Sequence, residues 1–169
     1  RTALASGESR WITGADARTD VHRWRARASC ILTGRGTVAS DDPSMTVRLP
    51  EQEVPAAARP PWVAIADSGL AVAPTARLFD LHERVVIFTL STENDAAAAL
   101  RARGAEIVAL PGDRDGHGID PASLFAELGR REVNEVHVEA GPTLCGRLLE
   151  TGYVDELIVY MAPQVLGDG

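Results

Sequence analysis

Hydrophobic and polar residues follow one another along this chain in blocks of strand and helix length. Continuous apolar runs predict short buried strands at 30–33, 62–66, 85–89, 106–109, 136–138 and 157–161. Helical spacing and helix-start signals predict helices at about 13–28, 94–103, 121–131 and 143–150. Polar segments rich in Gly or Pro predict loops at 50–61 and 111–119.

The alternation of strands and helices indicates the fold class. Strands that are apolar throughout are typical of a mainly parallel sheet with helices on both faces. A length of 169 residues suits one domain with a substantial core. We therefore predict a single α/β domain over residues 1–169. The chain lacks an initiator Met and stops at the turn signal Gly167-Asp168-Gly169, which indicates a fragment of a longer protein.

The first predicted helix has two different faces. Its apolar stripe is formed by residues at helical spacing, namely Ala17, Val21, Trp24 and Ala28. Its opposite face is basic and carries Arg18, His22, Arg23, Arg25 and Arg27. A solvated face explains these side chains, and a phosphate-binding role for Arg25 is the functional alternative.

Charge and composition narrow the range of partners and chemistry. The net charge of −7 argues against nucleic acid or an anionic membrane as the main partner. No apolar run approaches the ~20 residues that span a bilayer, and no signal peptide opens the chain, so we expect a cytoplasmic protein. All 17 basic residues are arginines, which excludes Schiff-base and P-loop lysine chemistry within this chain. Cys30 and Cys145 lie in apolar stretches and are expected to be buried structural thiols.

The segment 139–144 is the most suggestive strand end, because ligands of open α/β sheets collect at the carboxyl ends of strands. Here a strand enters a helix through a Gly turn, and the free amides at a helix start favour phosphate. A plain strand-to-helix turn explains the segment equally well. Glu139 is placed where a ligand would lie, although an exposed strand-end carboxylate is as good an interpretation.

Two further strand ends are candidates. Residues 33–37 include two glycines that allow a close backbone approach, and Arg35 and Thr37 are positioned to contact phosphate or ribose. A β-turn followed by an Asp-initiated turn at 41–43 is the alternative. Residues 67–69 look like an ordinary turn.

The remaining candidates concern phosphate and metal. Arg25 and Arg48 are the best candidates for clamping a substrate phosphate, because guanidinium groups bind phosphate in a bidentate manner. The four histidines lack metal-ligand spacing, so we expect no metal site. No Gly-x-Ser-x-Gly elbow or Cys/His pair suggests acyl transfer. Chemistry without a nucleophile, lysine or metal indicates that a cofactor carries the reaction.

Taken together, several motifs in order along the chain resemble one known family. They are Ala5-Ser6-Gly7-Glu8-Ser9-Arg10-Trp11-Ile12-Thr13, then Ala17-Arg18-x-Asp20-Val21-His22, then Ile31-Leu32-Thr33-Gly34-x-Gly36-Thr37-Val38, then Asp41-Asp42-Pro43-x-Met45-Thr46-Val47-Arg48, then Val138-Glu139-Ala140-Gly141-Pro142-Thr143-Leu144, then Val154-Asp155-Glu156-Leu157-Ile158-Val159-Tyr160-x-Ala162-Pro163. They resemble the reductase domain of the bacterial riboflavin-biosynthesis deaminase/reductase. The resemblance implies a dihydrofolate-reductase-like fold that uses NADPH. It also implies reduction of the ribosyl group of 5-amino-6-(5-phosphoribosylamino)uracil to the ribityl form.

The resemblance also implies roles for individual positions. The cofactor contacts would be Trp11, Thr37, Asp41, Ser68, Gly141, Pro142, Thr143, Leu144, Cys145, Gly146 and Arg147. The contacts to the phosphorylated substrate would be Ser9, Arg25, Met45, Arg48 and Glu139. Glu139 or Asp41 would act as the catalytic acid, which requires that partial burial raise the pKa of the carboxyl group.

Several expectations about the whole protein come from the same resemblance. The family's opening strand would precede Arg1, and its final strands would follow Gly169. An amino-terminal zinc deaminase domain and a homodimer are expected. Two other functions stay open: a dihydrofolate-reductase-like reductase of a pterin or another heterocycle, and a non-catalytic nucleotide-binding module.

Overall fold

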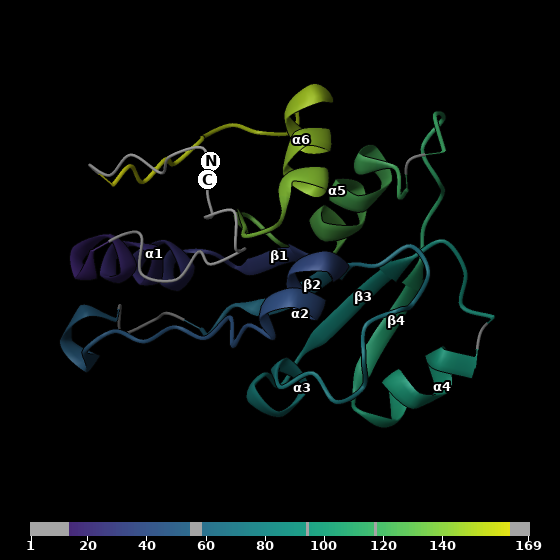
Figure 1. The fold of residues 1–169 in the computed structure, drawn as a ribbon, viewed down its shortest axis with the longest axis horizontal. Helices are drawn as coiled ribbons and strands as arrows, with labels where there is room; N and C mark the ends of the chain where they lie inside the picture. The colour runs from purple at the N-terminus through teal and green to yellow at the C-terminus, as the bar shows by residue number, and fades with distance from the viewer. Residues whose placement is uncertain (1–13, 55–58, 94, 117, 163–169) are drawn as a thin grey trace, which may run out of the picture.

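A computed structural model of the chain describes residues 14–54, 59–93, 95–116 and 118–162. Its centre is a five-stranded sheet in the order β4-β3-β2-β1-β5, in which every described pairing is parallel. The strands are β1 (Cys30–Gly34), β2 (Trp62–Ala66), β3 (Val85–Thr89), β4 (Ala105–Ala109) and β5 (Val136–Val138). The predicted parallel sheet is therefore confirmed (Figure 1).

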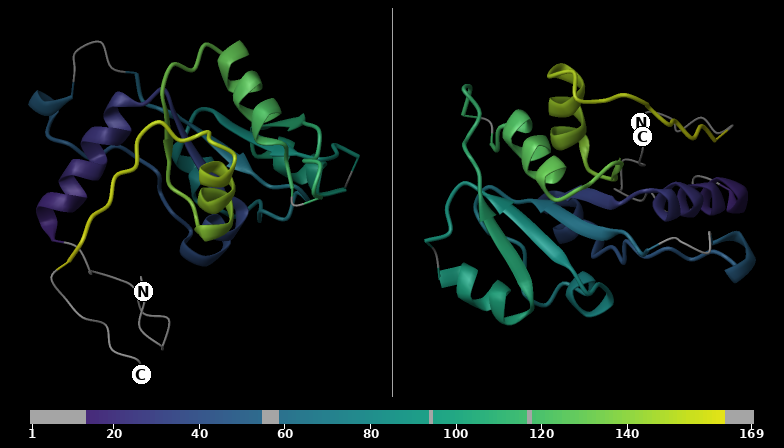
Figure 2. Two further views of the ribbon diagram at one scale, coloured as in Figure 1. Left: turned by 90° about the horizontal axis from the view of Figure 1, so that it is seen from above. Right: turned by 180° about the vertical axis from the view of Figure 1, so that it is seen from behind.

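Helices cover both faces of this sheet, as the sequence predicts. One face carries α2 (Arg35–Asp41), α3 (Leu78–Leu81) and α4 (Asp95–Ala102), and the other carries α5 (Pro121–Arg130) and α6 (Pro142–Glu150) (Figures 1 and 2). Helix α1 (Ala15–Arg27) projects beyond the amino end of β1, and a short 3₁₀ turn lies at Glu51–Glu53. Within the described ranges, every helix is too short or too polar to span a bilayer.

The core explains why the strand sequences are continuous apolar runs. Ile31, Val63 and Ile87 point into the layer under α2, α3 and α4. Their neighbours Leu32 and Phe88 point into the layer under α5 and α6. Successive side chains alternate between faces, so a strand that is buried on both sides is apolar at most positions, and Thr33 and Thr89 are buried polar exceptions.

Helix α2 was not predicted. The glycines around Arg35 suggested a closing turn, but Gly34 is the residue before the helix, and Val38 on its inner face is buried. The helix ends at Asp41, and the next residue, Asp42, is in the left-handed conformation with φ of 39°. One buried side chain in seven residues is too weak a pattern to be recognised from sequence, because tertiary contact supplies most of the stability of a short helix.

The predicted strand at 157–161 is wrong. The segment makes no strand pairing with any described part of the chain, and Leu157, Val159 and Met161 are 67%, 63% and 87% exposed. An apolar run becomes a strand only where a neighbouring strand can pair with its backbone, and none does so here. Instead, the segment is held against α1 by the Tyr160 hydroxyl, which donates to Asp20 at 2.7 Å.

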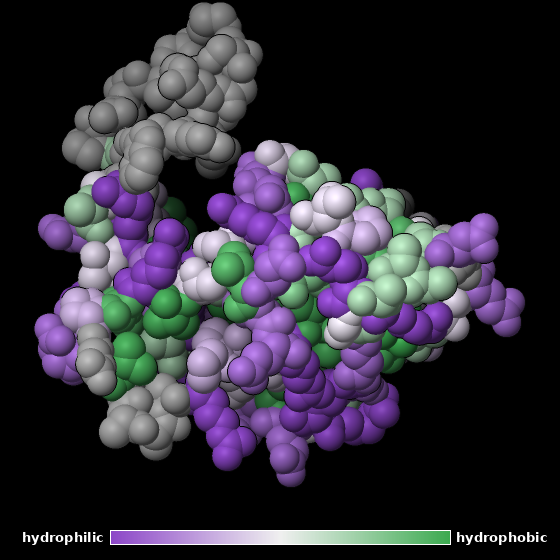
Figure 3. All heavy atoms as spheres, turned by 90° about the horizontal axis from the view of Figure 1, so that it is seen from below, coloured by the Kyte–Doolittle hydropathy of each residue, from purple (hydrophilic) through white to green (hydrophobic). Residues whose placement is uncertain are grey.

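Figure 3 shows the molecular surface from below, where polar side chains predominate and apolar ones lie between them.

Candidate functional site

A cleft of about 1280 Å³ opens at the carboxyl ends of β1, β2 and β5. It is lined by ten of the residues that the sequence singled out: Thr37, Asp41, Met45, Ser68, Glu139, Gly141, Pro142, Thr143, Leu144 and Arg147. Segments that are far apart in the chain therefore converge at the edge where parallel sheets bind ligands.

The turn between β5 and α6 supplies hydrogen-bond donors to this cleft. Gly141 precedes the helix, and no side chain caps its amino end. The amides of Thr143 and Leu144, in the first helical turn, therefore have no helical carbonyl to bond with. A side-chain carbon added at Gly141 would lie 3.8 Å from Thr37 Oγ1, so this turn and α2 approach each other closely. Free amides at a helix start suit a phosphate.

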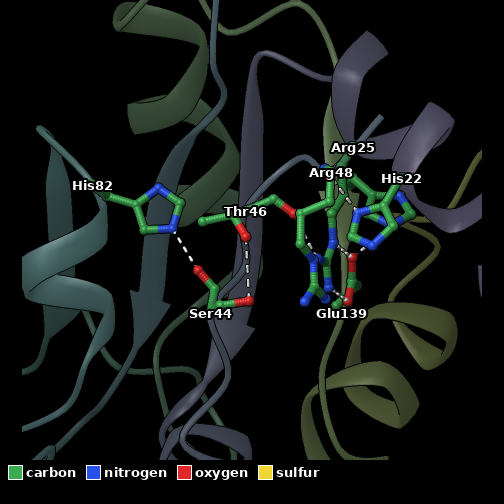
Figure 4. Close-up of polar contacts among 8 residues, drawn as sticks. His22, Arg25, Ser44, Thr46, Arg48, His82 and Glu139 are labelled. Atoms are coloured by element: carbon green, nitrogen blue, oxygen red, sulfur yellow. Dashed lines mark hydrogen bonds and ion pairs between the residues drawn. The ribbon is translucent and has the colours of Figure 1, made fainter. Parts of the chain in front are cut away.

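Glu139 lies directly after β5, and its amide extends the sheet by donating to the Leu32 carbonyl at 2.9 Å. Its carboxylate receives two hydrogen bonds from Arg25, from Nε at 2.5 Å and from Nη2 at 2.6 Å (Figure 4). The third guanidinium nitrogen of Arg25 donates to the Thr46 carbonyl at 2.9 Å. The side chain of Arg25 is only 10% exposed and that of Glu139 only 24%, so the pair is largely shielded from water.

These contacts set the charge state of Glu139. Burial raises the pKa of its carboxyl group, but the hydrogen bonds from Arg25 and the nearby His137 ring outweigh burial and lower the pKa to about 2. His137 Nε2 lies 3.1 Å from Glu139 Oε1. The raised pKa that a catalytic acid needs is therefore not found at Glu139, which is an anion near neutral pH.

A second group of polar residues orders the chain from Ser44 to Arg48. The Arg48 amide donates to His22 Nδ1 at 3.3 Å, and His82 Nε2 donates to the Ser44 carbonyl at 2.7 Å (Figure 4). Burial and the charges of Arg25 and Arg48 lower the pKa of His22, which keeps this ring neutral and able to accept. The Arg48 side chain is exposed.

Two arginines line the cleft itself. Arg147 is held by two carboxylates, at 2.9 Å from Asp113 and 3.3 Å from Asp115. Arg35 is 55% exposed, and Asp67 at the end of β2 approaches its Nε to 4.0 Å. The two arginines therefore differ in how far nearby carboxylates neutralise them.

Some predicted residues lie elsewhere. Arg25 and Arg48 do not line the cleft, although Arg25 contacts it through its bonds to Glu139. Ser9 and Trp11 are outside the described residues. Cys145 and Gly146 belong to α6 but do not line the cleft, and Cys145 Sγ donates to the Ala140 carbonyl at 3.3 Å. Both cysteines are free thiols, as expected, although only Cys30 is buried.

Two residues of the site were missed. His137 was considered only as a metal ligand, although it shares a strand face with Glu139 two positions on. Asp67 was interpreted as part of a turn; its side chain is fully buried, and one oxygen accepts from the Val72 amide at 2.8 Å. The alternation along a strand reveals the first residue, but nothing in the sequence reveals the second.

These features define a single α/β domain. Its cleft lies at the carboxyl edge of a parallel sheet and offers free helix-start amides to an anion. Sequence comparison identifies the family of this domain. The chain belongs to the RibD C-terminal domain family, whose model matches residues 1–169.

Curated relatives agree with this assignment. Riboflavin biosynthesis protein RibD of Escherichia coli is 40% identical over 174 residues, which cover 99% of this chain and 46% of that protein. A 5-amino-6-(5-phosphoribosylamino)uracil reductase of Buchnera aphidicola is 32% identical over 179 residues, covering 97% of this chain and 80% of that protein. The chain thus spans less than half the length of the Escherichia coli relative.

Solved structures show the same fold. Acinetobacter baumannii RibD matches with a TM-score of 0.68 at 26% identity, over 100% of this chain and 46% of that one. A Thermotoga maritima deaminase/5-amino-6-(5-phosphoribosylamino)uracil reductase matches with a TM-score of 0.65 at 28% identity, over 89% of this chain and 38% of that one. The expected dihydrofolate-reductase-like fold is confirmed.

Proposed function

We propose that this chain is the reductase that converts the ribosyl group of 5-amino-6-(5-phosphoribosylamino)uracil to the ribityl form, with NADPH as the reductant. The observation that carries the proposal is the cleft in which the Gly141 turn and the Glu139 carboxylate lie side by side. The name of the Buchnera relative, which is matched over most of its length, supports the substrate.

The groups that line the cleft support the binding of a dinucleotide. The uncapped start of α6 offers the amides of Thr143 and Leu144 to a phosphate, while Thr37 in α2 and Ser68 after β2 offer hydroxyl groups. When bound, the reduced nicotinamide supplies a hydride to the sugar of the substrate. The chain's own contribution is to hold both ligands in a reactive orientation.

The other end of the site would hold the substrate. Glu139, fixed as a carboxylate by Arg25, is an acceptor for substrate hydroxyl groups. Arg48 has an exposed guanidinium and is the better placed of the two arginines to bind the substrate phosphate, because Arg25 already donates to Glu139 and Thr46. Met45 is buried and gives the cleft an apolar wall.

Reduction of the sugar also needs a proton. Asp41 lines the cleft, and we assign it the proton donor once the bound cofactor and substrate bury its carboxyl group, because a carboxyl group can donate near neutral pH only when burial raises its pKa. Glu139 could take this role only if ligand binding broke its contacts with Arg25, because its pKa of about 2 leaves no proton to give.

The proposal is tested by mixing the full chain with NADPH and the phosphoribosylaminouracil and following the near-ultraviolet absorbance of the nicotinamide. We expect absorbance to fall only when the substrate is present. NADPH binding without oxidation would favour a non-catalytic nucleotide-binding module. Oxidation with a pterin but not with the phosphorylated substrate would favour the heterocycle reductase.

Three further properties are proposed with this function. The curated relatives are longer than this chain, and we propose that the full protein has an amino-terminal zinc deaminase domain. We also propose that the enzyme works in the cytoplasm as a homodimer. Size measurement and metal analysis of the full-length protein test the dimer and the zinc.

A further inference from the structure

Arg35 is a positive charge in the cleft that the proposed function leaves without a role. It follows β1 directly, lines the cleft, and has a side chain that is 55% exposed. Among the described residues, no carboxylate comes closer to its Nε than the 4.0 Å separating it from Asp67 Oδ1. Arg35 therefore retains most of its hydrogen-bonding capacity for a ligand.

Asp67 holds Arg35 in place without neutralising it by direct contact. The carboxylate is fully buried, and Oδ2 is used by the Val72 amide. Oδ1 has no hydrogen-bond partner within the described part of the chain. A buried carboxylate oxygen without a partner is costly unless a nearby positive charge compensates it. This oxygen therefore attracts Arg35 toward the end of β2, but cannot itself reach a ligand.

The other cleft-lining arginine is already occupied. Arg147 lies 2.9 Å from Asp113, whose side chain is only 3% exposed. Asp115 adds a second carboxylate at 3.3 Å. An anion that approached Arg147 would have to compete with both carboxylates, so Arg35 is the more available cation in the cleft.

The strand order indicates which part of a dinucleotide would reach Arg35. Glu139 marks the β5 side of the cleft, whereas Ser68 and Gly69 mark the β2 side, and β1 lies between these strands. If the reacting ring lay near Glu139 and a phosphate on the α6 turn, the adenosine half would extend toward β2. Arg35 stands on that side, beside Asp67.

We propose that Arg35 binds the 2′-phosphate on the adenosine ribose of the cofactor and is the residue that makes the chain prefer NADPH to NADH. The inference rests on the proposed function for the identity of the cofactor. The chemistry is that of a guanidinium donating charge-assisted hydrogen bonds to a phosphate that NADH lacks.

The test is equilibrium binding of two adenosine fragments to the full chain by calorimetry. Adenosine 2′,5′-bisphosphate carries the extra phosphate, and adenosine 5′-monophosphate does not. We expect wild-type protein to bind the bisphosphate about tenfold or more tightly than the monophosphate, since hydrogen bonds to charged groups have this strength. Arg35→Ser should abolish the difference while leaving the monophosphate affinity unchanged.

Arg101→Ser is the matched control, because Arg101 is an exposed arginine on α4 and does not line the cleft. It should keep the wild-type difference. A preference for the bisphosphate that survives Arg35→Ser would overturn the proposal. Equal weakening of both fragments would also overturn it, because Arg35 would then contact a part that the two fragments share.

Steady-state kinetics separates this inference from the proposed function. In Arg35→Ser, the KM for NADPH should rise at least tenfold, whereas kcat and the kinetic constants with NADH should stay as in wild type. Absence of reductase activity in wild-type protein would contradict the proposed function, and the fragment affinities would still decide the role of Arg35.

Discussion

Arg25 Nε lies 2.5 Å from Glu139 Oε1, although the two residues are 114 positions apart in the chain. The contact joins the end of α1 to the end of β5, and a second bond from Nη2 at 2.6 Å makes it bidentate. Because Thr46 binds the same guanidinium, the pair also fixes the segment that carries Met45. One side chain thus orients the carboxylate at the cleft and the loop beside it.

Removing Arg25 should destabilise the protein strongly. Arg25→Ala leaves the Glu139 carboxylate partly buried without its main partner, which we expect to lower the free energy of unfolding by about 3 kcal/mol. Urea denaturation measures this change. Arg27→Ala is the control, because Arg27 binds Glu135 in a pair whose side chains are 56% and 35% exposed. The control should lose at most about 1 kcal/mol, and equal losses in both variants would contradict the buried pair.

The same pair predicts how stability depends on pH. The pKa of Glu139 is about 2 in the folded protein, below its ordinary value, so the folded state favours the carboxylate. This contribution is complete above about pH 5 and is lost as the pH falls toward 2. Glu139→Gln should remove about 2 kcal/mol of this acid-sensitive stability. The free energy of unfolding of wild type and Glu139→Gln, measured across the acid range, checks this prediction. Parallel curves of stability against pH for the two proteins would contradict it.

A side chain at Gly141 should weaken ligand binding more than it lowers the stability of the fold. Its backbone has a φ of −73°, and an added side-chain carbon meets only Thr37 Oγ1 at 3.8 Å, so Gly141→Ala should fold with less than about 1 kcal/mol change. In the proposed binding mode the new methyl group would lie where a phosphate approaches the first amides of α6, and it should weaken NADPH binding at least tenfold. Titration of NADPH fluorescence measures this loss. Gly129→Ala on α5, outside the cleft, should leave NADPH binding unchanged.

Arg48 provides the test of a phosphorylated substrate. Arg48→Ala should raise the KM for the phosphoribosylaminouracil by tenfold or more and leave the KM for NADPH as it was, because only the substrate phosphate loses a partner. The local backbone should persist, since Arg48 bonds to His22 through its amide. Steady-state kinetics with each ligand varied in turn checks the prediction. An unchanged substrate KM would favour a phosphate-free heterocycle instead.

Sequence pattern alone identified the sheet and most of its helices. Runs such as 85–88 are apolar throughout because both faces of each strand are covered, and this signal is local. The turn at Gly141 was also visible, because a strand end, a glycine and a helix start follow one another in the chain. The residues that meet at the carboxyl edge follow from the parallel topology.

Tertiary structure determined the side-chain partners and strand pairings that no local sequence pattern predicts. The partner of Glu139 is Arg25 on a distant helix, and this contact reverses the pKa shift that burial alone would cause. The apolar run at 157–161 is not a strand, because pairing depends on a neighbour and not on the run itself. The different states of Arg147 and Arg35 likewise depend on which carboxylates the fold places beside them. Hydrophobic periodicity determines most of the elements, whereas charge and strand pairing depend on distances that only the folded chain fixes.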